Sequence, residues 1–397
     1  MNKPLSKVID KSIPTERFIG HCKGSQEGPT LIFVAGIHGN EPSGIYALRK
    51  VLTDLEEDKS KFRGNIYAIN GNLPALKKGV RYLKQDLNRI WTEQTIEQIQ
   101  NHEPDDGNLE SLQLKAIYFS IEKILSSENG PFYFFDLHTT SSKTIPFITV
   151  NDSLLNRKYT SHYPVPLILG IEEFLEGALL SYINEKGYVA FGFEGGQHDD
   201  PSSIDNHIAF IKLSLVFSGC MNETDLDFRK YYHHLCHKVG HSRQFYEIIT
   251  RYEIKPFEEF NMFNGFTNFQ RIRKGDRLAT SNGRPLYSEG NGFIFMPLYQ
   301  GKGNDGYFVI QKTPKLFLNI STILRKTRFD KILPLLPGVQ WSSTKQDELI
   351  VNLKIARFFT RKFLHLLGYR NKKVDETHLR VKNREAASKA SEYKGYF

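Results

Sequence analysis

The sequence contains little cysteine and no long hydrophobic run. Its three cysteines, Cys22, Cys220 and Cys236, are too few and too scattered for a disulfide framework, so we expect free thiols in a reducing compartment. No uninterrupted apolar stretch approaches the ~20 residues that a membrane helix needs. Residues 1–18 also lack the apolar core of a signal peptide. A cytoplasmic location is therefore expected.

Net charge is also scarce over most of the chain. The formal net charge is +9, and residues 351–397 alone hold twelve Lys or Arg against four Asp or Glu, an excess of eight. The rest of the chain is thus almost neutral, which argues against an enzyme that acts on nucleic acid. The 397 residues, 40% of them hydrophobic, are enough for one large domain or two.

Short, continuous apolar runs alternate with segments in which apolar residues recur at helical spacing. This pattern predicts an α/β fold with a mostly parallel, mixed sheet flanked by helices. Such sheets bind ligands beyond the carboxyl ends of their strands, so polar residues at strand ends are the first candidates for catalysis and binding. The expected strands are 30–36, 64–70, 131–138 and 187–196, and the expected helices are 42–52, 111–125 and 202–219.

The pattern changes after about residue 245, where glycine-containing turns separate short apolar runs and predict a small β-rich domain. Residues 348–369 are amphipathic and are predicted to be helical, whereas the polar residues 383–397 are expected to fray. The predicted domains are therefore an α/β domain, a β-rich domain and a basic helical C-terminal extension, over residues 1–248, 249–325 and 326–397.

Three residues at predicted strand ends suggest a metal site. A His-x-x-Glu pair such as His38 and Glu41 is common by chance and is weak evidence alone. His138, however, ends a second predicted strand, which brings all three residues to the same edge of the sheet. Two imidazoles and one carboxylate leave an open position, as in catalytic zinc sites, whereas structural zinc sites are closed and usually rich in thiolates. We therefore expect one zinc ion per chain.

Further polar residues are candidates for catalysis and binding. Glu194 follows another predicted strand and precedes two glycines. A surface turn is the ordinary explanation, but beside a zinc site a proton-transferring carboxylate is favoured. Arg81 and Arg89 lie eight positions apart, with Asn88 before the second. Guanidinium groups suit carboxylates and developing oxyanions, although such arginines are often simply solvated.

Four motifs in this order resemble the succinylglutamate desuccinylase/aspartoacylase family of zinc-dependent hydrolases, which are relatives of the zinc carboxypeptidases. The motifs are "GIHGNEPSG" (36–44), "RYLKQDLNRIW" (81–91), "DLHTTSS" (136–142) and "FEGGQ" (193–197). The resemblance covers roughly residues 30 to 310 and implies a zinc-carboxypeptidase-like sheet over residues 1–248.

The resemblance also implies roles for individual residues. His38, Glu41 and His138 would bind zinc, and Glu194 would be the general acid/base. The remaining implied roles are carbonyl polarisation by Arg81, binding of the acyl-side carboxylate by Asn88 and Arg89, and a contact from the second domain by Tyr299.

One position departs from the family pattern. An arginine ten residues before the catalytic glutamate helps to hold the amine-side carboxylate of aspartoacylase substrates, and this chain has Asn184 there. The amine half of the substrate is therefore not expected to be a simple free amino acid held in that way.

The leading functional hypothesis is a zinc-dependent amidohydrolase that deacylates an N-acyl amino acid or a related small N-acyl compound, with no nucleic-acid partner. One alternative is a metallocarboxypeptidase that acts on a small peptide. Another is a non-catalytic protein whose basic C-terminal segment contacts a membrane surface. We favour that segment packing its apolar face on its own protein. A homodimer is left open.

Overall fold

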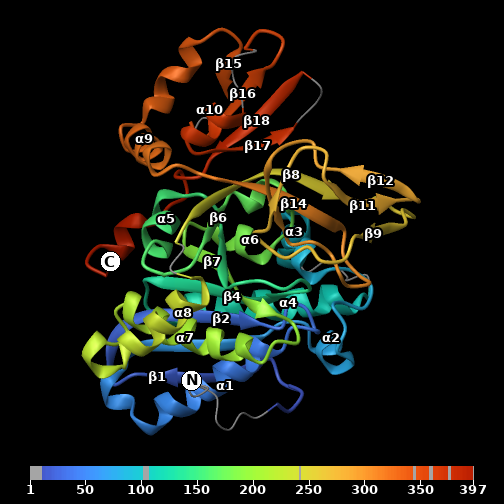
Figure 1. The fold of residues 1–397 in the computed structure, drawn as a ribbon. Helices are drawn as coiled ribbons and strands as arrows, with labels where there is room; N and C mark the ends of the chain where they lie inside the picture. Colours follow the sequence, from blue (N-terminus) through green and yellow to red (C-terminus); the bar gives the residue numbers. More distant parts are fainter. Residues whose placement is uncertain are drawn as a thin grey trace.

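A computed structural model describes residues 11–101, 107–240, 243–342, 346–356, 361–373 and 377–396 (Figure 1). The first part of the chain alternates strands and helices. Its strands are β1 (Phe18–Lys23), β2 (Gln26–Ala35), β3 (Arg63–Asn70), β4 (Phe132–Thr140), β5 (Phe147–Val150), β6 (Leu167–Leu169) and β7 (Val189–Gln197). Its helices are α1 (Ser43–Glu57), α2 (Leu73–Lys78), α3 (Glu93–Gln100), α4 (Leu109–Ser127), α5 (Leu154–Thr160), α6 (Leu179–Glu185), α7 (Ser202–Phe217) and α8 (Phe228–Lys238), with short 3₁₀ turns at η1 (Lys59–Lys61), η2 (Leu87–Arg89), η3 (Ile171–Glu173) and η4 (Glu223–Asp225).

One large mixed sheet organises this part of the molecule. Within the described residues it has eleven strands in the order β1-β3-β2-β4-β7-β5-β6-β8-β14-β13-β10. Strands β3, β2, β4 and β7 are parallel neighbours, whereas β5 runs antiparallel to β7. The last four strands are β8 (Phe245–Glu253), β14 (Asp305–Lys312), β13 (Gly292–Phe295) and β10 (Arg271–Ile272). The predicted mixed sheet with flanking helices is confirmed.

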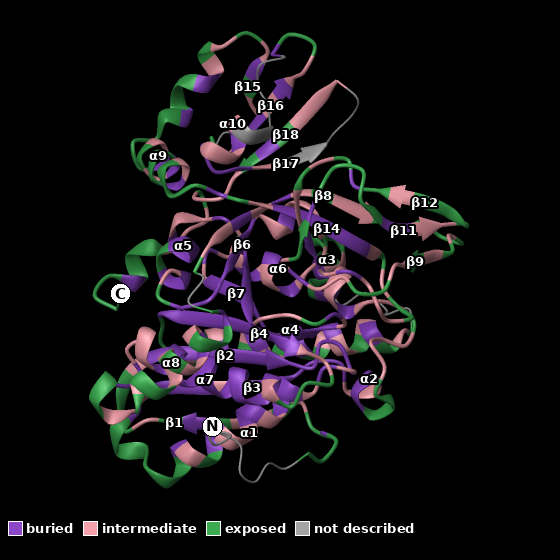
Figure 2. Cartoon of the chain, viewed as in Figure 1, coloured by how far each residue is buried: buried purple, intermediate pink, exposed green. Residues whose placement is uncertain are grey.

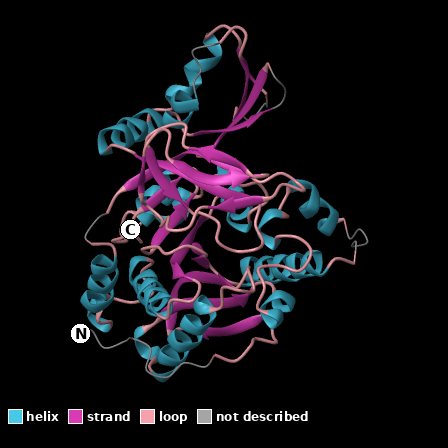
Figure 3. Ribbon diagram, turned by 45° about the vertical axis from the view of Figure 1, so that its right-hand side comes forward, coloured by secondary structure: helices cyan, strands magenta, loops and turns pink. Residues whose placement is uncertain are grey.

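The central strands are buried on both faces because helices cover each side of the sheet (Figures 2 and 3). Successive side chains of a strand point to opposite faces. Accordingly, Leu31, Phe33 and Ala35 of β2 belong to the core that includes residues of α1 and α7. Ile32 and Val34 belong to the opposite core, with residues of α4 and α6. A continuous apolar run is thus the signature of this buried strand.

The glycine-rich region contributes to two sheets. Strands β8, β14, β13 and β10 extend the main sheet, while a three-stranded sheet has the order β12-β11-β9. Loops of this region return to the α/β part: Gln300 accepts a hydrogen bond from Asn40 at 2.9 Å, and Lys302 donates to the carbonyl of Tyr82 at 2.8 Å. The strands of the smaller sheet are β9 (Phe260–Met262), β11 (Arg277–Ser281) and β12 (Arg284–Tyr287).

The prediction of one helix over residues 348–369 is wrong. The segment holds strand β16 (Glu348–Asn352), the short helix α10 (Arg361–Leu366) and the start of β17 (Tyr369–Lys373). Leu349 and Val351 are buried while their neighbours in β16 are half-buried, a period of two that fits a strand. Over a few residues, an amphipathic run can match both the helical period of about 3.6 and the strand period of two, so the pattern alone does not separate the two structures.

The basic C-terminal extension is a small sheet with helices, at the top of Figure 1. Its four strands, in the order β15-β16-β18-β17, share a separate core with α10. The elements are α9 (Lys315–Lys326), η5 (Phe329–Leu335), β15 (Val339–Trp341), β16 (Glu348–Asn352), α10 (Arg361–Leu366), β17 (Tyr369–Lys373), β18 (His378–Asn383) and η6 (Ala390–Tyr393).

The expectation that residues 383–397 fray is also wrong for the described residues. The tail returns to the α/β part beside α5 (Figure 1), and Tyr393 is 2% exposed. The Tyr393 hydroxyl accepts from the backbone N–H of Val189 at 3.0 Å and donates to the carbonyl of Phe132. It therefore ties the amino ends of β7 and β4. Among the described helices, none has both the length and the apolarity that crossing a bilayer requires.

Candidate active site

Three neighbouring elements bring the predicted metal-binding residues together. His38 and Glu41 lie in the turn between β2 and α1, and His138 lies near the carboxyl end of the adjacent strand β4. The turn is packed tightly, since a Cβ atom on Gly39 would lie 2.1 Å from the carbonyl carbon of Ala75. Only glycine therefore allows the chain to approach α2 so closely at this point.

The three side chains converge through defined atoms. Glu41 Oε1 lies 2.9 Å from His38 Nδ1, and Glu41 Oε2 lies 3.0 Å from His138 Nδ1. One ligand atom from each residue falls within 4.8 Å of the others, which is close enough for one metal ion. All three are buried, so the group lies at the base of a depression and not on the open surface.

A carboxylate stands behind each imidazole. His38 Nε2 lies 3.1 Å from Asp86 Oδ1, and His138 Nε2 lies 2.8 Å from Asp136 Oδ2. With a metal ion bound, these carboxylates would favour a proton on Nε2 of each ring and leave the Nδ1 lone pairs for the ion. A carboxylate–imidazole arrangement of this kind orients metal-binding histidines and raises their basicity.

The charge balance of this group also fits a cation. Three carboxylates, those of Glu41, Asp86 and Asp136, adjoin the two imidazoles, and the guanidinium of Arg81 pairs with Glu41 and Asp86. Burial alone would raise the pKa of Glu41, but attraction to His38 and hydrogen bonds from both imidazoles hold it well below its ordinary value. The donor set and the excess negative charge therefore fit Zn²⁺.

Glu194 lies beside this group on the next strand. It is the register partner of His138 in the parallel pair β4–β7. Its side chain is buried, and Oε2 has no hydrogen-bond partner among the described residues. Burial raises the pKa of Glu194 to about 8, with Glu41 and Asp136 adding to the effect and His138 opposing it. This carboxyl group can therefore exchange a proton near neutral pH.

The two arginines of the second motif have different surroundings. Arg81 lies 2.9 Å from Asp86 and 3.5 Å from Glu41, which directs it at the three-residue group. Arg89 donates to Asp305 at 2.8 Å and to the carbonyl of Asn88 at 2.9 Å. A substrate carboxylate at Arg89 would thus compete with Asp305, a residue that the sequence motifs do not include.

Asn88 and Arg89 line the same cavity as the three-residue group, but Tyr299 does not. The Asn88 side-chain oxygen accepts from the backbone N–H of Leu179 at 3.0 Å. The Tyr299 hydroxyl instead donates to the carbonyl of Phe263 at 2.9 Å. The neighbours of Tyr299 at positions 298 and 300 reach the cavity in its place.

Sequence reasoning did not assign roles to Asp86 and Asp136, although both lie within the quoted motifs. A usable signal existed for Asp136, because it stands two positions before His138 and residues at that spacing share one face of a strand. Asp86 gave no such signal, since a loop and not a strand brings it to His38. His198, which pairs with Thr139 at 2.7 Å at the cavity wall, gave none either.

The cavity extends from the three-residue group along β5 and β7. Its volume is about 1040 Å³ including the open mouth. One end holds the metal-binding group, Glu194 and the two arginines. Other described residues of the lining combine apolar and polar side chains with one carboxylate, that of Glu172: Thr149, Asn151, Ile171, Glu172, Leu175, Ala178, Leu180, Ser181, Phe191 and Gly192.

Fold and site together define an α/β protein with a His–Glu–His group, of the type that holds a catalytic metal, at the carboxyl edge of its sheet. Residues 27–167 match the model of the succinylglutamate desuccinylase/aspartoacylase catalytic domain. The resemblance carried by the sequence motifs to this family is therefore confirmed.

Individual relatives show the same resemblance. A succinylglutamate desuccinylase of Photorhabdus laumondii is 40% identical over 75 residues, 19% of this chain and 22% of the relative. A probable aspartoacylase of Acaryochloris marina is 30% identical over 167 residues, which cover 40% of this chain and 52% of the relative. The chain thus spans about a fifth and about half of these two relatives.

Solved structures share the fold. A succinylglutamate desuccinylase/aspartoacylase from Rhodobacter sphaeroides aligns with a TM-score of 0.54 at 16% identity, and the alignment covers 74% of this chain and 88% of that one. The likeness concerns the fold, which is the α/β arrangement described above.

Proposed function

We propose that the protein is a zinc-dependent hydrolase that cleaves the amide bond of an N-acyl amino acid or a related small N-acyl compound. One observation carries the proposal: two imidazoles present Nδ1 to a shared carboxylate, each with its own carboxylate behind it, and the buried Glu194 adjoins them. This combination is suited to activating water and moving its proton.

The proposed chemistry divides among few groups. His38, Glu41 and His138 would hold Zn²⁺, which when bound supplies Lewis-acid activation of water and of the scissile carbonyl. Glu194 accepts a proton from the attacking water and later delivers it to the departing nitrogen. Arg81 stabilises negative charge that develops on the carbonyl oxygen. The products are a carboxylic acid and an amine.

The loop over residues 296–305 supports a deacylase over a carboxypeptidase. Met296, Leu298, Gln300 and Asp305 contribute to the cavity wall, and Gln300 also lies 3.3 Å from His198. A wall supplied by a second region of the chain encloses the site and favours small substrates over long peptides. A cytoplasmic location belongs to the same proposal, because the three cysteines are free thiols.

Metal analysis and a substrate panel test the proposal. We expect about one zinc per chain, lost in a His38→Ala, His138→Ala double variant but retained in the control His198→Ala, whose ring lines the cavity outside the ligand group. Zinc-loaded protein should release amine from N-acyl amino acids. Full zinc occupancy in the double variant, or amine release from peptides alone, would refute the proposal.

A further inference from the structure

Helix α9 of the C-terminal extension has a buried side and an exposed apolar side. On the inward side, Leu318 and Arg325 are buried against the rest of the chain. Leu316, Ile320 and Ile323 are exposed by 70%, 42% and 61%, and their spacing places them together on the opposite side of the helix. Packing within the described chain therefore accounts for the inward side of α9, whereas the outward side holds three aliphatic groups in solvent.

The exposed apolar groups continue beyond α9. The following turn η5 packs against α9 and exposes Phe329, Ile332 and Leu335, of which Leu335 is 83% exposed. Residues 316–335 thus hold six of the fifteen large apolar side chains that the described residues expose, so the exposure is concentrated in one segment. Exposed apolar groups that gather in this way mark an interaction surface, whereas groups that are scattered singly need no explanation. These six side chains are called the outward apolar surface below.

The exposed charges of the same segment are all positive. Between residues 315 and 338 the single acidic residue, Asp330, is buried and accepts hydrogen bonds from Tyr369 and Asn383, each at 3.0 Å. The exposed charged residues have no ion pair within the described part of the chain and are Lys315, Lys326, Arg328 and Lys331. Aliphatic groups and unpaired cations therefore share this segment, with no exposed acidic group among them.

The wider surroundings of α9 are basic as well. Residues 315–397 hold eighteen Lys or Arg against seven Asp or Glu, an excess of eleven, while the whole chain has a net charge of +9. The groove between α9, α5 and the C-terminal tail (Figure 1) has one carboxylate among its described lining residues, that of Glu385, which lies 3.2 Å from Arg325. The lysines of that lining are Lys158, Lys315, Lys326 and Lys394. A partner with negative charge therefore fits this side of the molecule.

The basic segment 348–369 takes no part in this surface. Leu349, Val351, Leu364 and Leu367 are buried in the core of the C-terminal extension. These side chains thus pack on the protein itself, and the aliphatic groups left in solvent lie on α9 and η5.

We propose that α9 and η5 bind an anionic membrane surface. The outward apolar surface enters the boundary between headgroups and acyl chains, and the four exposed cations lie at the lipid phosphates, as in helices that bind at a bilayer interface. A second copy of this chain fits less well, because a contact of this surface with itself brings the same cations together with no acidic group opposite. The proposal goes beyond the deacylase function and does not depend on it.

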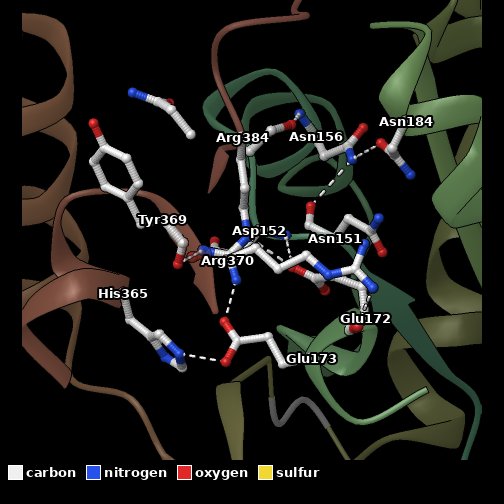
Figure 4. Close-up of polar contacts among 12 residues, drawn as sticks. Asn151, Asp152, Asn156, Glu172, Glu173, Asn184, His365, Tyr369, Arg370 and Arg384 are labelled. Atoms are coloured by element: carbon white, nitrogen blue, oxygen red, sulfur yellow. Dashed lines mark hydrogen bonds and ion pairs between the residues drawn. The ribbon is translucent and has the colours of Figure 1, made fainter. Parts of the chain in front are cut away.

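The C-terminal extension that carries this surface is joined to the α/β part by polar contacts (Figure 4). Arg384 donates to Glu172 at 2.7 Å, and His365 Nε2 lies 2.5 Å from Glu173 Oε2. Arg370 donates to the main-chain carbonyl of Glu172 at 2.7 Å. Because these contacts are buried or half-buried, binding through α9 and η5 also orients the catalytic part relative to the membrane.

Co-sedimentation of the full chain with lipid vesicles tests the proposal without requiring turnover. The protein should bind vesicles of phosphatidylcholine mixed with phosphatidylserine at least about tenfold more tightly than vesicles of phosphatidylcholine alone, because cations near an anionic surface each add to the affinity. Added salt should weaken the binding by screening the charges. A protein that stays in the supernatant with the mixed vesicles at low salt would overturn the proposal.

Two double variants assign the binding to this surface. Leu316→Gln with Ile323→Gln removes two aliphatic groups, and Lys326→Gln with Lys331→Gln removes two cations. Each double variant should weaken binding to the mixed vesicles by about tenfold or more. All four side chains are exposed, so the variants should fold as the wild type does.

Matched controls change the same residue types elsewhere on the surface. Leu109→Gln with Leu112→Gln alters two exposed leucines of α4, and Lys255→Gln with Lys274→Gln alters two exposed lysines of the β-rich region. Both controls should bind the mixed vesicles as tightly as the wild type does. Equal losses in the controls and in the α9 and η5 variants would reduce the binding to general charge and hydrophobicity and overturn the assignment.

Sedimentation velocity without lipid separates a membrane contact from a contact between copies of the chain. Leu316→Gln with Ile323→Gln should leave the oligomeric state of the protein unchanged. A wild-type dimer that this double variant dissociates would assign the outward apolar surface to a second copy and overturn the membrane proposal.

Discussion

Two clusters of buried charge lie in the α/β part of the chain, and they are built differently. Around Glu41, three carboxylates meet two imidazoles and one arginine, and the group opens into a cavity. Around Asp152, by contrast, the opposite charges are paired. Arg157 and Arg325 both donate to the Asp152 carboxylate, with Arg157 Nη2 at 2.7 Å and Arg325 Nη2 at 2.8 Å from Oδ2, and Arg325 also lies 3.2 Å from Glu385.

The difference separates a binding site from a structural junction. Burying charge costs free energy unless each charge is paired, and the Asp152 cluster meets that condition with partners from α9 and from the C-terminal tail. The cluster around Glu41 leaves an excess of negative charge that a metal ion would neutralise. We therefore expect changes in the first cluster to affect catalysis and changes in the second to affect folding.

The largest expected effect is on turnover. Glu194→Gln should lower kcat by ~10²–10⁴ while zinc content and melting temperature remain close to wild type, because only proton transfer is lost. Glu122→Gln is the control, since Glu122 pairs with Lys186 at the surface. Near-normal turnover in Glu194→Gln would show that another group moves the proton.

A substitution in the Asp152 cluster should lower the free energy of unfolding. Asp152→Asn leaves Arg157 and Arg325 without their shared carboxylate, and breaking a buried pair in this way costs about 3–5 kcal/mol of unfolding free energy. Urea unfolding at neutral pH measures the loss. The zinc content of the folded variant should be unchanged. A variant that lost zinc but kept its stability would mean that Asp152 supports the metal site and not the fold.

The pH dependence of that loss follows from the pKa of Asp152. Burial raises it, but attraction to Arg157 and Arg325 outweighs burial and holds the pKa far below its ordinary value of ~3.9. The folded pKa is thus below the unfolded one, so the stabilisation is complete above pH ~4 and declines as the pH falls further. The stability difference between wild type and Asp152→Asn should shrink below pH ~4. A constant difference would assign the effect to packing.

A smaller effect is expected for Arg89, which tests the predicted acyl-side contact. With a dicarboxylic acyl group, Arg89→Ala should raise KM by about tenfold or more, because a charged hydrogen bond is lost. With an acetyl group the change should be slight. Asp305→Asn should have the opposite effect, since it removes the competitor that pairs with Arg89 at 2.8 Å. Equal losses for both substrates would mean that Arg89 supports the loop and does not bind the acyl group.

The smallest effect is expected at the tail. Tyr393→Phe removes the hydroxyl that accepts from Val189 and leaves a buried N–H group without a partner. The cost should be about 1–3 kcal/mol of unfolding free energy. Turnover should be unchanged because Val189 and Phe132 begin β7 and β4, whereas the site lies at the other ends of those strands. A fall in kcat without a loss of stability would contradict this view of the tail.

Features set by local pattern were predictable from the sequence. The apolar run at 131–138 predicted β4, which spans Phe132–Thr140, and the helical spacing at 111–125 predicted α4, which spans Leu109–Ser127. His38, Glu41 and His138 follow from the same reasoning, because parallel strands end at a common edge. Position along a strand or turn was enough to bring these residues together.

Features that depend on distant segments were decided only in the tertiary structure. Asp305 pairs with Arg89 across 216 positions, and Arg384 contacts Glu172 across 212. The tail is ordered because Tyr393 finds partners on β4 and β7, and nothing in its polar composition indicates them. Local composition sets which face of an element is apolar, but the pairing of buried charges depends on which elements the fold brings into contact.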